Sequence, residues 1–164
     1  MKGQNLSKRP ARVFAMELLY AMEMTGEPVG QRVDGVLDSV EKLYGKDKKN
    51  GNEKSLIPEM KRYGMSLVDQ IQEHRAEFDK ILSEYSRGWE LDRFAVLDRI
   101  ILYIALAELL YETDVPVKVV IQESIEMANK YSTENSYRFI NGILNQFARD
   151  KGIIFASDKS EEKR

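Results

Sequence analysis

The residues that could take part in chemistry are few in this sequence of 164 residues. Its one histidine, His74, stands in a charged run, and there is no cysteine. A thiol nucleophile, a disulfide scaffold and a Cys-ligated zinc site are therefore excluded. A lone histidine on a polar helix face is more often a solvated residue than a general base. The sequence also lacks a serine-nucleophile motif, a metal-ligand spacing of acidic residues and a Gly-rich phosphate loop, so we expect no enzyme activity, cofactor or metal.

Basic residues at the N-terminus are the first candidate binding site. Residues 1–16 contain Lys2, Lys8, Arg9 and Arg12 and no acid, whereas the whole chain has a net charge of −2. Cations in the first turn of a helix oppose its dipole and cost about 0.3–1 kcal/mol each. Two explanations stay open: these cations face a phosphate backbone, or they form an ordinary solubilising terminus.

The second candidate lies between Tyr131 and Gly142. The dipeptide Asn-Gly that ends at Gly142 favours a hairpin, but the apolar spacing around it is helical, so we predict a helix. A glycine inside a helix costs about 1 kcal/mol relative to alanine, which suggests that another backbone approaches closely. The adjacent Arg138 and Phe139 could bind a phosphate and stack on a base. The alternative is that Phe139 belongs to the core and Arg138 is solvated.

Opposite charges also gather near the start of a predicted apolar helix, at Asp92, Arg93, Asp98 and Arg99. These residues could form surface salt bridges, which contribute under about 1 kcal/mol. They could equally form the charged rim of a protein interface.

Hydrophobic periodicity predicts helices throughout the chain. The third of them could break near Glu73, and the fourth should be central because Ile100–Ala107 is apolar almost all round. Residues 45–55 have no apolar side chain, which predicts a solvated, mobile loop. The expected helices span about 10–24, 31–44, 58–85, 92–111, 117–130 and 133–151, the last capped by Ser132 or Thr133.

This pattern predicts an all-α fold, a bundle of six or seven helices. We expect a basic arm over residues 1–9, a single all-helical domain over 10–152 and a charged, disordered tail over 153–164. No run of about 18 uncharged apolar residues is present, so we expect no membrane association.

A series of short segments, taken in order, matches a known pattern. The segments are Ala11–Tyr20, Trp89–Arg93, Asp98–Leu109, Asp114–Pro116, Val119–Glu123, Glu126–Lys130, Thr133–Ser136 and Arg138–Leu144. In them the sequence resembles the NusB transcription antitermination family, nearly continuously in its C-terminal half. The resemblance implies a bundle of two three-helix halves.

The resemblance also implies a function. It implies binding to boxA-like single-stranded RNA of ribosomal-RNA transcripts, together with the ribosomal protein NusE, in the cytoplasmic Nus complex on RNA polymerase. The implied RNA-binding residues are Lys8, Arg9, Arg12, Tyr20, Arg138 and Phe139, and the implied NusE-binding residues are Asp98, Glu90 and Asp92. Tyr103 stands where the family commonly has arginine, which would reshape that part of the surface. The alternative is a helical protein-interaction adaptor that binds no RNA.

Overall fold

The computed structural model describes residues 3–49, 52–86, 93–112 and 114–153. The chain divides into two compact units, Met1–Asp69 and Gln70–Arg164, which are described separately below. The expected disordered tail over 153–164 lies outside the described residues, apart from its first residue.

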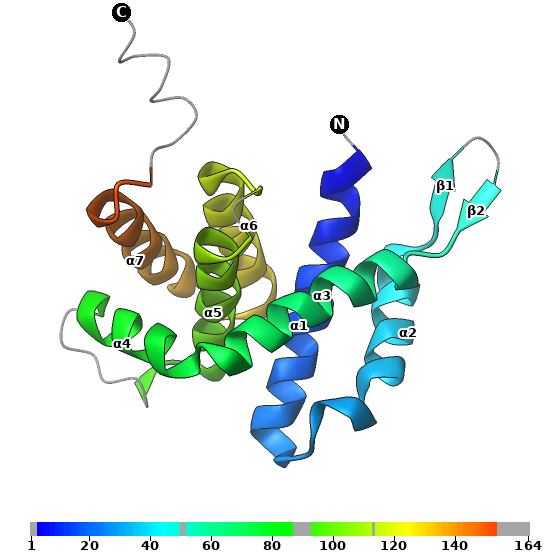
Figure 1. The fold of residues 1–164 in the computed structure, drawn as a ribbon, viewed down its shortest axis with the longest axis horizontal. Helices are drawn as coiled ribbons and strands as arrows, with labels where there is room; N and C mark the ends of the chain where they lie inside the picture. The colour runs from blue at the N-terminus through cyan, green and yellow to red at the C-terminus, as the bar shows by residue number, and fades with distance from the viewer. Residues whose placement is uncertain (1–2, 50–51, 87–92, 113, 154–164) are drawn as a thin grey trace, which may run out of the picture. The chain divides into compact units, whose positions relative to one another are not determined.

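The first unit contains helices α1, α2 and most of α3, with a short β-hairpin between α2 and α3 (Figure 1). Its elements are α1 (Gly3–Thr25), the 3₁₀ helix η1 (Val29–Gln31), α2 (Val33–Tyr44), β1 (Asp47–Lys49), β2 (Asn52–Lys54) and α3 (Ile57–Glu73).

Helix α1 begins earlier than the sequence predicted. It starts at Gly3, and Pro10 lies inside it rather than in its first turn. A proline inside a helix removes one backbone hydrogen bond, but the ring of Pro10 is buried and adds to the packed surface. Ala11, Ala15 and Leu18 recur at helical spacing along α1 and are fully buried.

The expectation of a loop without regular structure after α2 is wrong, because residues 47–49 and 52–54 form two antiparallel strands. Their register pairs Asp47 with Lys54 and Lys49 with Asn52. The sequence between the strands is Asn-Gly, the strongest short-range hairpin signal. That signal does not depend on apolar side chains, and so an argument from hydropathy alone missed it.

The chain returning from the hairpin is held by Glu41 of α2. The carboxylate of Glu41 accepts hydrogen bonds from the Ser55 hydroxyl at 2.5 Å and from the Leu56 amide at 3.0 Å. The Ser55 hydrogen bond is the main cause of a lowered pKa for Glu41. These contacts fix the start of α3 relative to the end of α2.

Helices α1 and α3 cross at a glycine. A Cβ added at Gly64 would lie 2.3 Å from a ring carbon of Phe14 and 3.1 Å from the Ala11 carbonyl oxygen. Real Cβ atoms essentially never approach a neighbour so closely. Gly64, rather than the predicted Gly142, is therefore the glycine that a close approach requires.

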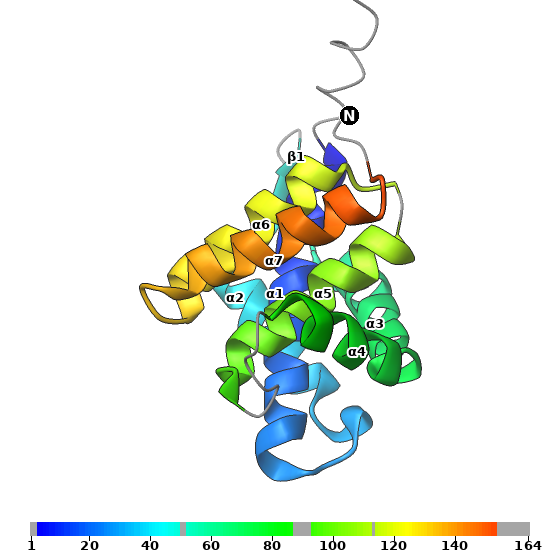
Figure 2. The same ribbon diagram turned by 90° about the vertical axis from the view of Figure 1, so that its left-hand side faces the viewer.

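The second unit contains the end of α3 and helices α4 (Arg75–Tyr85), α5 (Val96–Leu110), α6 (Val117–Tyr131) and α7 (Ser136–Asp150). Helix α6 packs against both α5 and α7, and α7 also contacts α4. Figure 2 shows α6 and α7 side by side. Every residue of α5 from Ile100 to Leu109 is buried, so the prediction of a central fourth helix is confirmed.

Helix α7 ends the described bundle but begins later than expected. It starts at Ser136, and the preceding Asn135 makes no side-chain cap. Ser132, one of the two expected caps, instead donates a hydrogen bond from its hydroxyl to Asp98 of α5. The predicted break in the third helix is confirmed, because α3 ends at Glu73 and α4 begins at Arg75.

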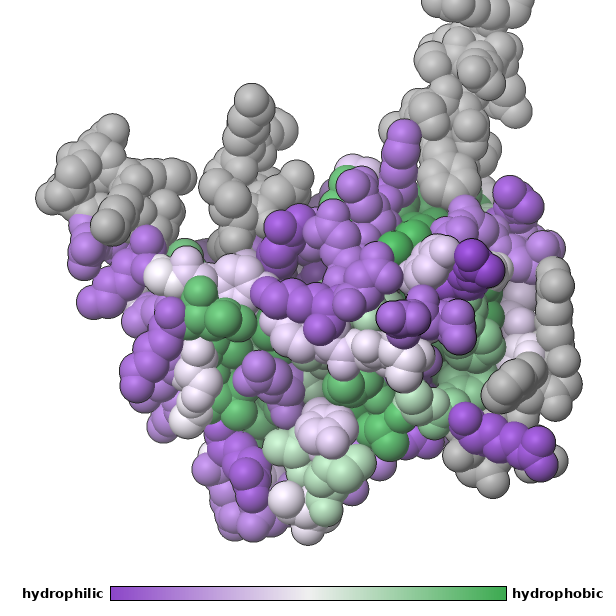
Figure 3. All heavy atoms as spheres, turned by 180° about the vertical axis from the view of Figure 1, so that it is seen from behind, coloured by the Kyte–Doolittle hydropathy of each residue, from purple (hydrophilic) through white to green (hydrophobic). Residues whose placement is uncertain are grey.

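On the face that Figure 3 shows, hydrophilic and hydrophobic residues lie side by side. The large hydrophobic residues that are exposed are Tyr20, Met24, Leu43 and Tyr111. Within the described ranges, no helix combines the length and the apolar character that crossing a membrane requires.

We expect Gly64→Ala to destabilise the protein by about 1–3 kcal/mol, because the new methyl group must displace the Phe14 ring or the α1 backbone. Gly35→Ala on α2 is the matched control, since a Cβ there meets no atom within 4 Å. The control should be neutral or stabilise by up to about 1 kcal/mol. Urea unfolding of both variants measures the difference, and equal midpoints would contradict the tight crossing.

Candidate nucleic-acid interface

Helix α1 presents the first set of candidate RNA-binding residues. Arg9 is exposed, and Tyr20 is 40% exposed. They are eleven residues apart, which is about three helical turns, so they lie on the same face of α1 about 16 Å apart. This face offers a cation and an aromatic ring at a spacing that several nucleotides of a single strand could span.

The other two candidate cations of α1 are less accessible. The ammonium group of Lys8 lies 5.4 Å from the centre of the Tyr63 ring, a cation–π contact with α3. Arg12 is only 3% exposed and interacts with other groups of the protein. A guanidinium that is almost fully buried is poorly placed to neutralise a phosphate, so the exposed Arg9 is the best-placed cation of this set.

The second set lies at the start of α7. Arg138 is exposed, and its Nε donates a hydrogen bond to the Tyr137 hydroxyl at 2.8 Å. That hydrogen bond raises the pKa of Arg138. Phe139 is half-buried and meets the ring of Phe94 edge to face, with centroids 4.8 Å apart. The Phe139 ring thus packs on the protein and stays partly accessible, and its stacking on a base stays a prediction.

A pocket of about 560 Å³ adjoins this corner between the end of α4 and one face of α7. We call it the α4–α7 pocket. Its lining consists of Glu84, Tyr85, Ser86, Arg138, Phe139, Gly142, Ile143, Gln146 and Asp150. The α7 residues recur at helical spacing and could have been grouped from the sequence, but only the tertiary structure brings α4 opposite them.

Polar side chains define one wall of the α4–α7 pocket. The Gln146 amide donates to a carboxylate oxygen of Asp150 at 2.9 Å. Burial, and then a hydrogen bond to Asp150, raise the pKa of the Tyr85 hydroxyl. The Tyr85 ring packs edge to face against the ring of Phe147. The carboxylate of Asp150 is therefore fixed by two donors, at a pocket that also contains Glu84.

Asp98, expected on a charged rim, is 7% exposed and lies in the first turn of α5. Its two carboxylate oxygens accept hydrogen bonds from Ser132 at 2.5 Å and from Ser136 at 2.9 Å. The expectation of surface salt bridges is therefore wrong for this residue, because its hydrogen-bond partners are the half-buried Ser132 and the buried Ser136. Glu90 and Asp92, the other expected partner-binding residues, lie outside the described residues.

Tyr103 is 1% exposed and does not contribute to the surface, contrary to the sequence expectation. Its hydroxyl donates a hydrogen bond to Asp79 of α4, and the Arg75 guanidinium lies 4.8 Å from its ring centre. Burial is the main cause of a raised pKa for this hydroxyl, followed by the bond to Asp79. Tyr103 therefore joins α5 to α4.

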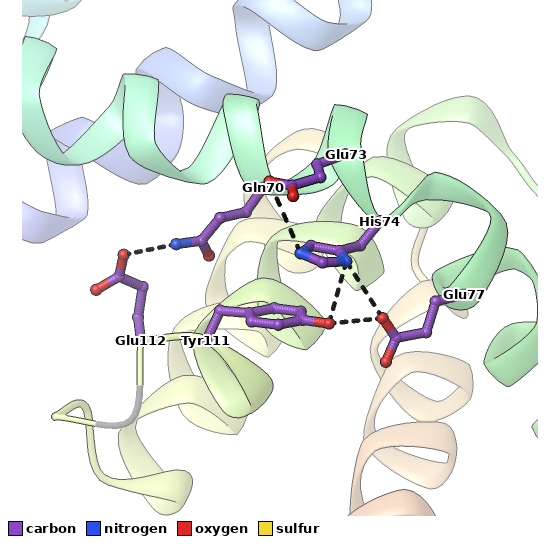
Figure 4. A network of polar contacts seen from close by, with 6 residues as sticks. All are labelled: Gln70, Glu73, His74, Glu77, Tyr111 and Glu112. Carbon is purple, nitrogen blue, oxygen red and sulfur yellow. Dashed lines mark hydrogen bonds and ion pairs between the residues drawn. The ribbon is translucent and has the colours of Figure 1, made fainter.

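His74 is half-buried at the junction of α3 and α4, not on a solvated helix face (Figure 4). Its ring stacks on Tyr111 with centroids 4.0 Å apart, and Nδ1 lies 3.4 Å from a carboxylate oxygen of Glu77. The Tyr111 hydroxyl donates to Glu77 at 2.6 Å, which raises its pKa to about 12. The described residues contain no group of three acidic or histidine side chains placed to hold a metal ion.

Comparisons with known proteins identify the family. A model described as the NusB family matches residues 9–149. The transcription antitermination protein NusB of Elusimicrobium minutum is 38% identical over 146 residues, 88% of this chain and 95% of that protein. The solved structure of T. maritima NusB is 32% identical, covers 86% of this chain and 89% of its own, and gives a TM-score of 0.69.

A solved structure of antitermination factors NusB and NusE in complex with dsRNA gives a TM-score of 0.67. It is 23% identical, covers 88% of this chain and 97% of its own, and supports the fold alone. Helix order and packing place this protein in the class of small all-helical proteins. The chain belongs to the NusB family, and the predictions of family and all-α fold are confirmed.

We expect Asp98→Ala to destabilise the protein by about 2 kcal/mol or more, because the hydroxyl groups of Ser132 and Ser136 lose a charged acceptor. Asp38→Ala on the exposed face of α2 is the matched control and should change stability by less than about 0.5 kcal/mol. Thermal and urea unfolding measure both. A stable Asp98 variant would restore the view of Asp98 as a surface charge.

Proposed function

We propose that this protein is a transcription antitermination factor that binds boxA-like single-stranded RNA of ribosomal-RNA transcripts. In this proposal it acts with the ribosomal protein NusE in the Nus complex on RNA polymerase, in the cytoplasm and without enzyme activity. The observation that carries the proposal is the NusB family match over residues 9–149, which includes all the candidate RNA-binding residues except Lys8.

The exposed cations and rings support RNA as the ligand. Arg9 and Tyr20 share one face of α1, and Arg138 stands beside the partly accessible ring of Phe139. Each pair combines a guanidinium, which binds phosphate, with an aromatic ring, which can stack on a base. Single-stranded RNA presents both groups, whereas the bases of a duplex are already stacked on each other.

Burial changes the expected roles of two residues. We propose that Arg12 supports the α1 surface from within and that Lys8 contributes through its contact with Tyr63. For NusE, Glu90 and Asp92 stay proposed contacts. Asp98 would act indirectly, since its hydrogen bonds to Ser132 and Ser136 hold the turn between α6 and α7.

We expect RNA affinity to depend on salt. If Lys8, Arg9 and Arg138 neutralise about three phosphates, the log–log slope for single-stranded RNA should be about −2. Affinity for a fluorescent boxA-like oligonucleotide should then fall about 20-fold between about 50 and 200 mM salt. Fluorescence anisotropy measures the slope, and each titration is repeated with NusE present.

Single variants assign that slope to residues. Arg9→Ala and Arg138→Ala should each make it about 0.7 less steep. Arg32→Ala is the control, because Arg32 is an exposed arginine already paired with Glu27 at 2.7 Å. If neither Arg9→Ala nor Arg138→Ala alters the slope, the assignment of these cations to phosphate contacts is contradicted. Tight NusE binding without any RNA binding would favour the protein-interaction adaptor instead.

A further inference from the structure

We propose that the α4–α7 pocket holds one unstacked base of the bound RNA, and that it selects a base with an exocyclic amino group over uracil. The proposal rests on the proposed RNA-binding function and adds a specificity to it. It is argued from the shape of the pocket, its charges and an unexplained glycine.

The size and walls of the pocket suit a flat ring. Its volume of about 560 Å³ lies in the range of small-molecule sites, about 300–1,000 Å³. Phe139 and Ile143 of α7 and Tyr85 of α4 line it, so two aromatic rings and an aliphatic side chain border the space. Aromatic rings of this kind receive bases that have left the stack.

The carboxylates at the pocket favour a base whose edge carries hydrogen-bond donors. Glu84 and Asp150 bring two carboxylates, which as ions can only accept hydrogen bonds. A carboxylate has about four lone-pair positions, so Asp150 keeps acceptor capacity beyond its bonds from Gln146 and Tyr85. Acceptors of this kind recognise an amino group, such as N4 of cytosine. Uracil has no amino group, and its single N3–H donor lies between two carbonyl oxygens, which the carboxylates repel.

Arg138 shows how the rest of the nucleotide would be held. It is the one cation among the pocket residues and is exposed to solvent. A free anion would meet two carboxylates inside the pocket, but a nucleotide can place its phosphate on Arg138 and its uncharged base inside. This arrangement favours a base within an RNA strand over a small anionic ligand.

Gly142 is a glycine inside helix α7. A glycine inside a helix destabilises it, yet packing does not demand one here, because an added Cβ would meet no atom within 4 Å. Gly142 lines the α4–α7 pocket. A larger side chain at this position would project from α7 into the pocket. The glycine therefore keeps the pocket open, although the packing of α7 does not require a glycine here.

The test compares two RNA probes of equal length, oligo(C)12 and oligo(U)12, by anisotropy at one salt concentration. Wild-type protein should prefer oligo(C)12 by about 5-fold or more, as expected for one amino group recognised by a carboxylate. Gly142→Leu should fill the pocket and bring the ratio of the two affinities close to one. Gly35→Leu is the matched control, because it is also an exposed helical glycine without a neighbour within 4 Å, and it should keep the preference.

Asp150→Asn is a second variant that keeps the size of the side chain but adds a donor, and it should also reduce the preference for oligo(C)12. Circular dichroism checks that each variant is folded. An unchanged ratio in folded Gly142→Leu, or equal binding of both probes by wild type, overturns the pocket proposal while RNA binding stands. Loss of NusE binding in Gly142→Leu with an unchanged ratio assigns the pocket to the protein partner and also overturns it. Failure of wild type to bind either probe or boxA-like RNA instead contradicts the proposed function itself.

Discussion

The constraint on which the second unit depends is the burial of α5 on all its sides. From Ile100 to Leu109 no residue of this helix is exposed. A helix that is apolar all round must be covered all round, because each large aliphatic side chain left in water costs about 1.5–3 kcal/mol. Helices α6 and α7 accordingly pack against α5.

Polar groups in this apolar surrounding fix the directions of the helices. Asp98 binds Ser132 and Ser136 at the turn between α6 and α7, and Tyr103 binds Asp79 of α4. Apolar packing tolerates small rotations, whereas a buried carboxylate without donors is expensive. The position of Arg138 and Phe139 near the start of α7 thus depends on a hydrogen bond between two buried residues, Asp98 and Ser136.

Particular residues show how far sequence reasoning reached. The helices, the break at His74, the central position of α5 and the helical nature of the Asn-Gly pair ending at Gly142 followed from periodicity. The hairpin after α2 was missed, although its own Asn-Gly dipeptide was readable, because periodicity was given more weight than turn chemistry. The pair Arg138 and Phe139 was found as a motif, but its neighbours across the pocket on α4 were not.

The sequence by itself determined the family, the helical fold and the residue types able to bind RNA, because these depend on spacing and composition along one chain. Only the tertiary structure decided which of those residues are accessible. Arg12, Asp98 and Tyr103 looked like surface residues, but each lies where another element covers it. Gly64 and Gly142 are both helical glycines, and the sequence does not tell their surroundings apart. In the tertiary structure, Gly64 lies against Phe14 of α1, whereas Gly142 lines the α4–α7 pocket. Burial depends on how two elements pack against each other, and the hydrophobic periodicity of one helix does not show which residues another element covers.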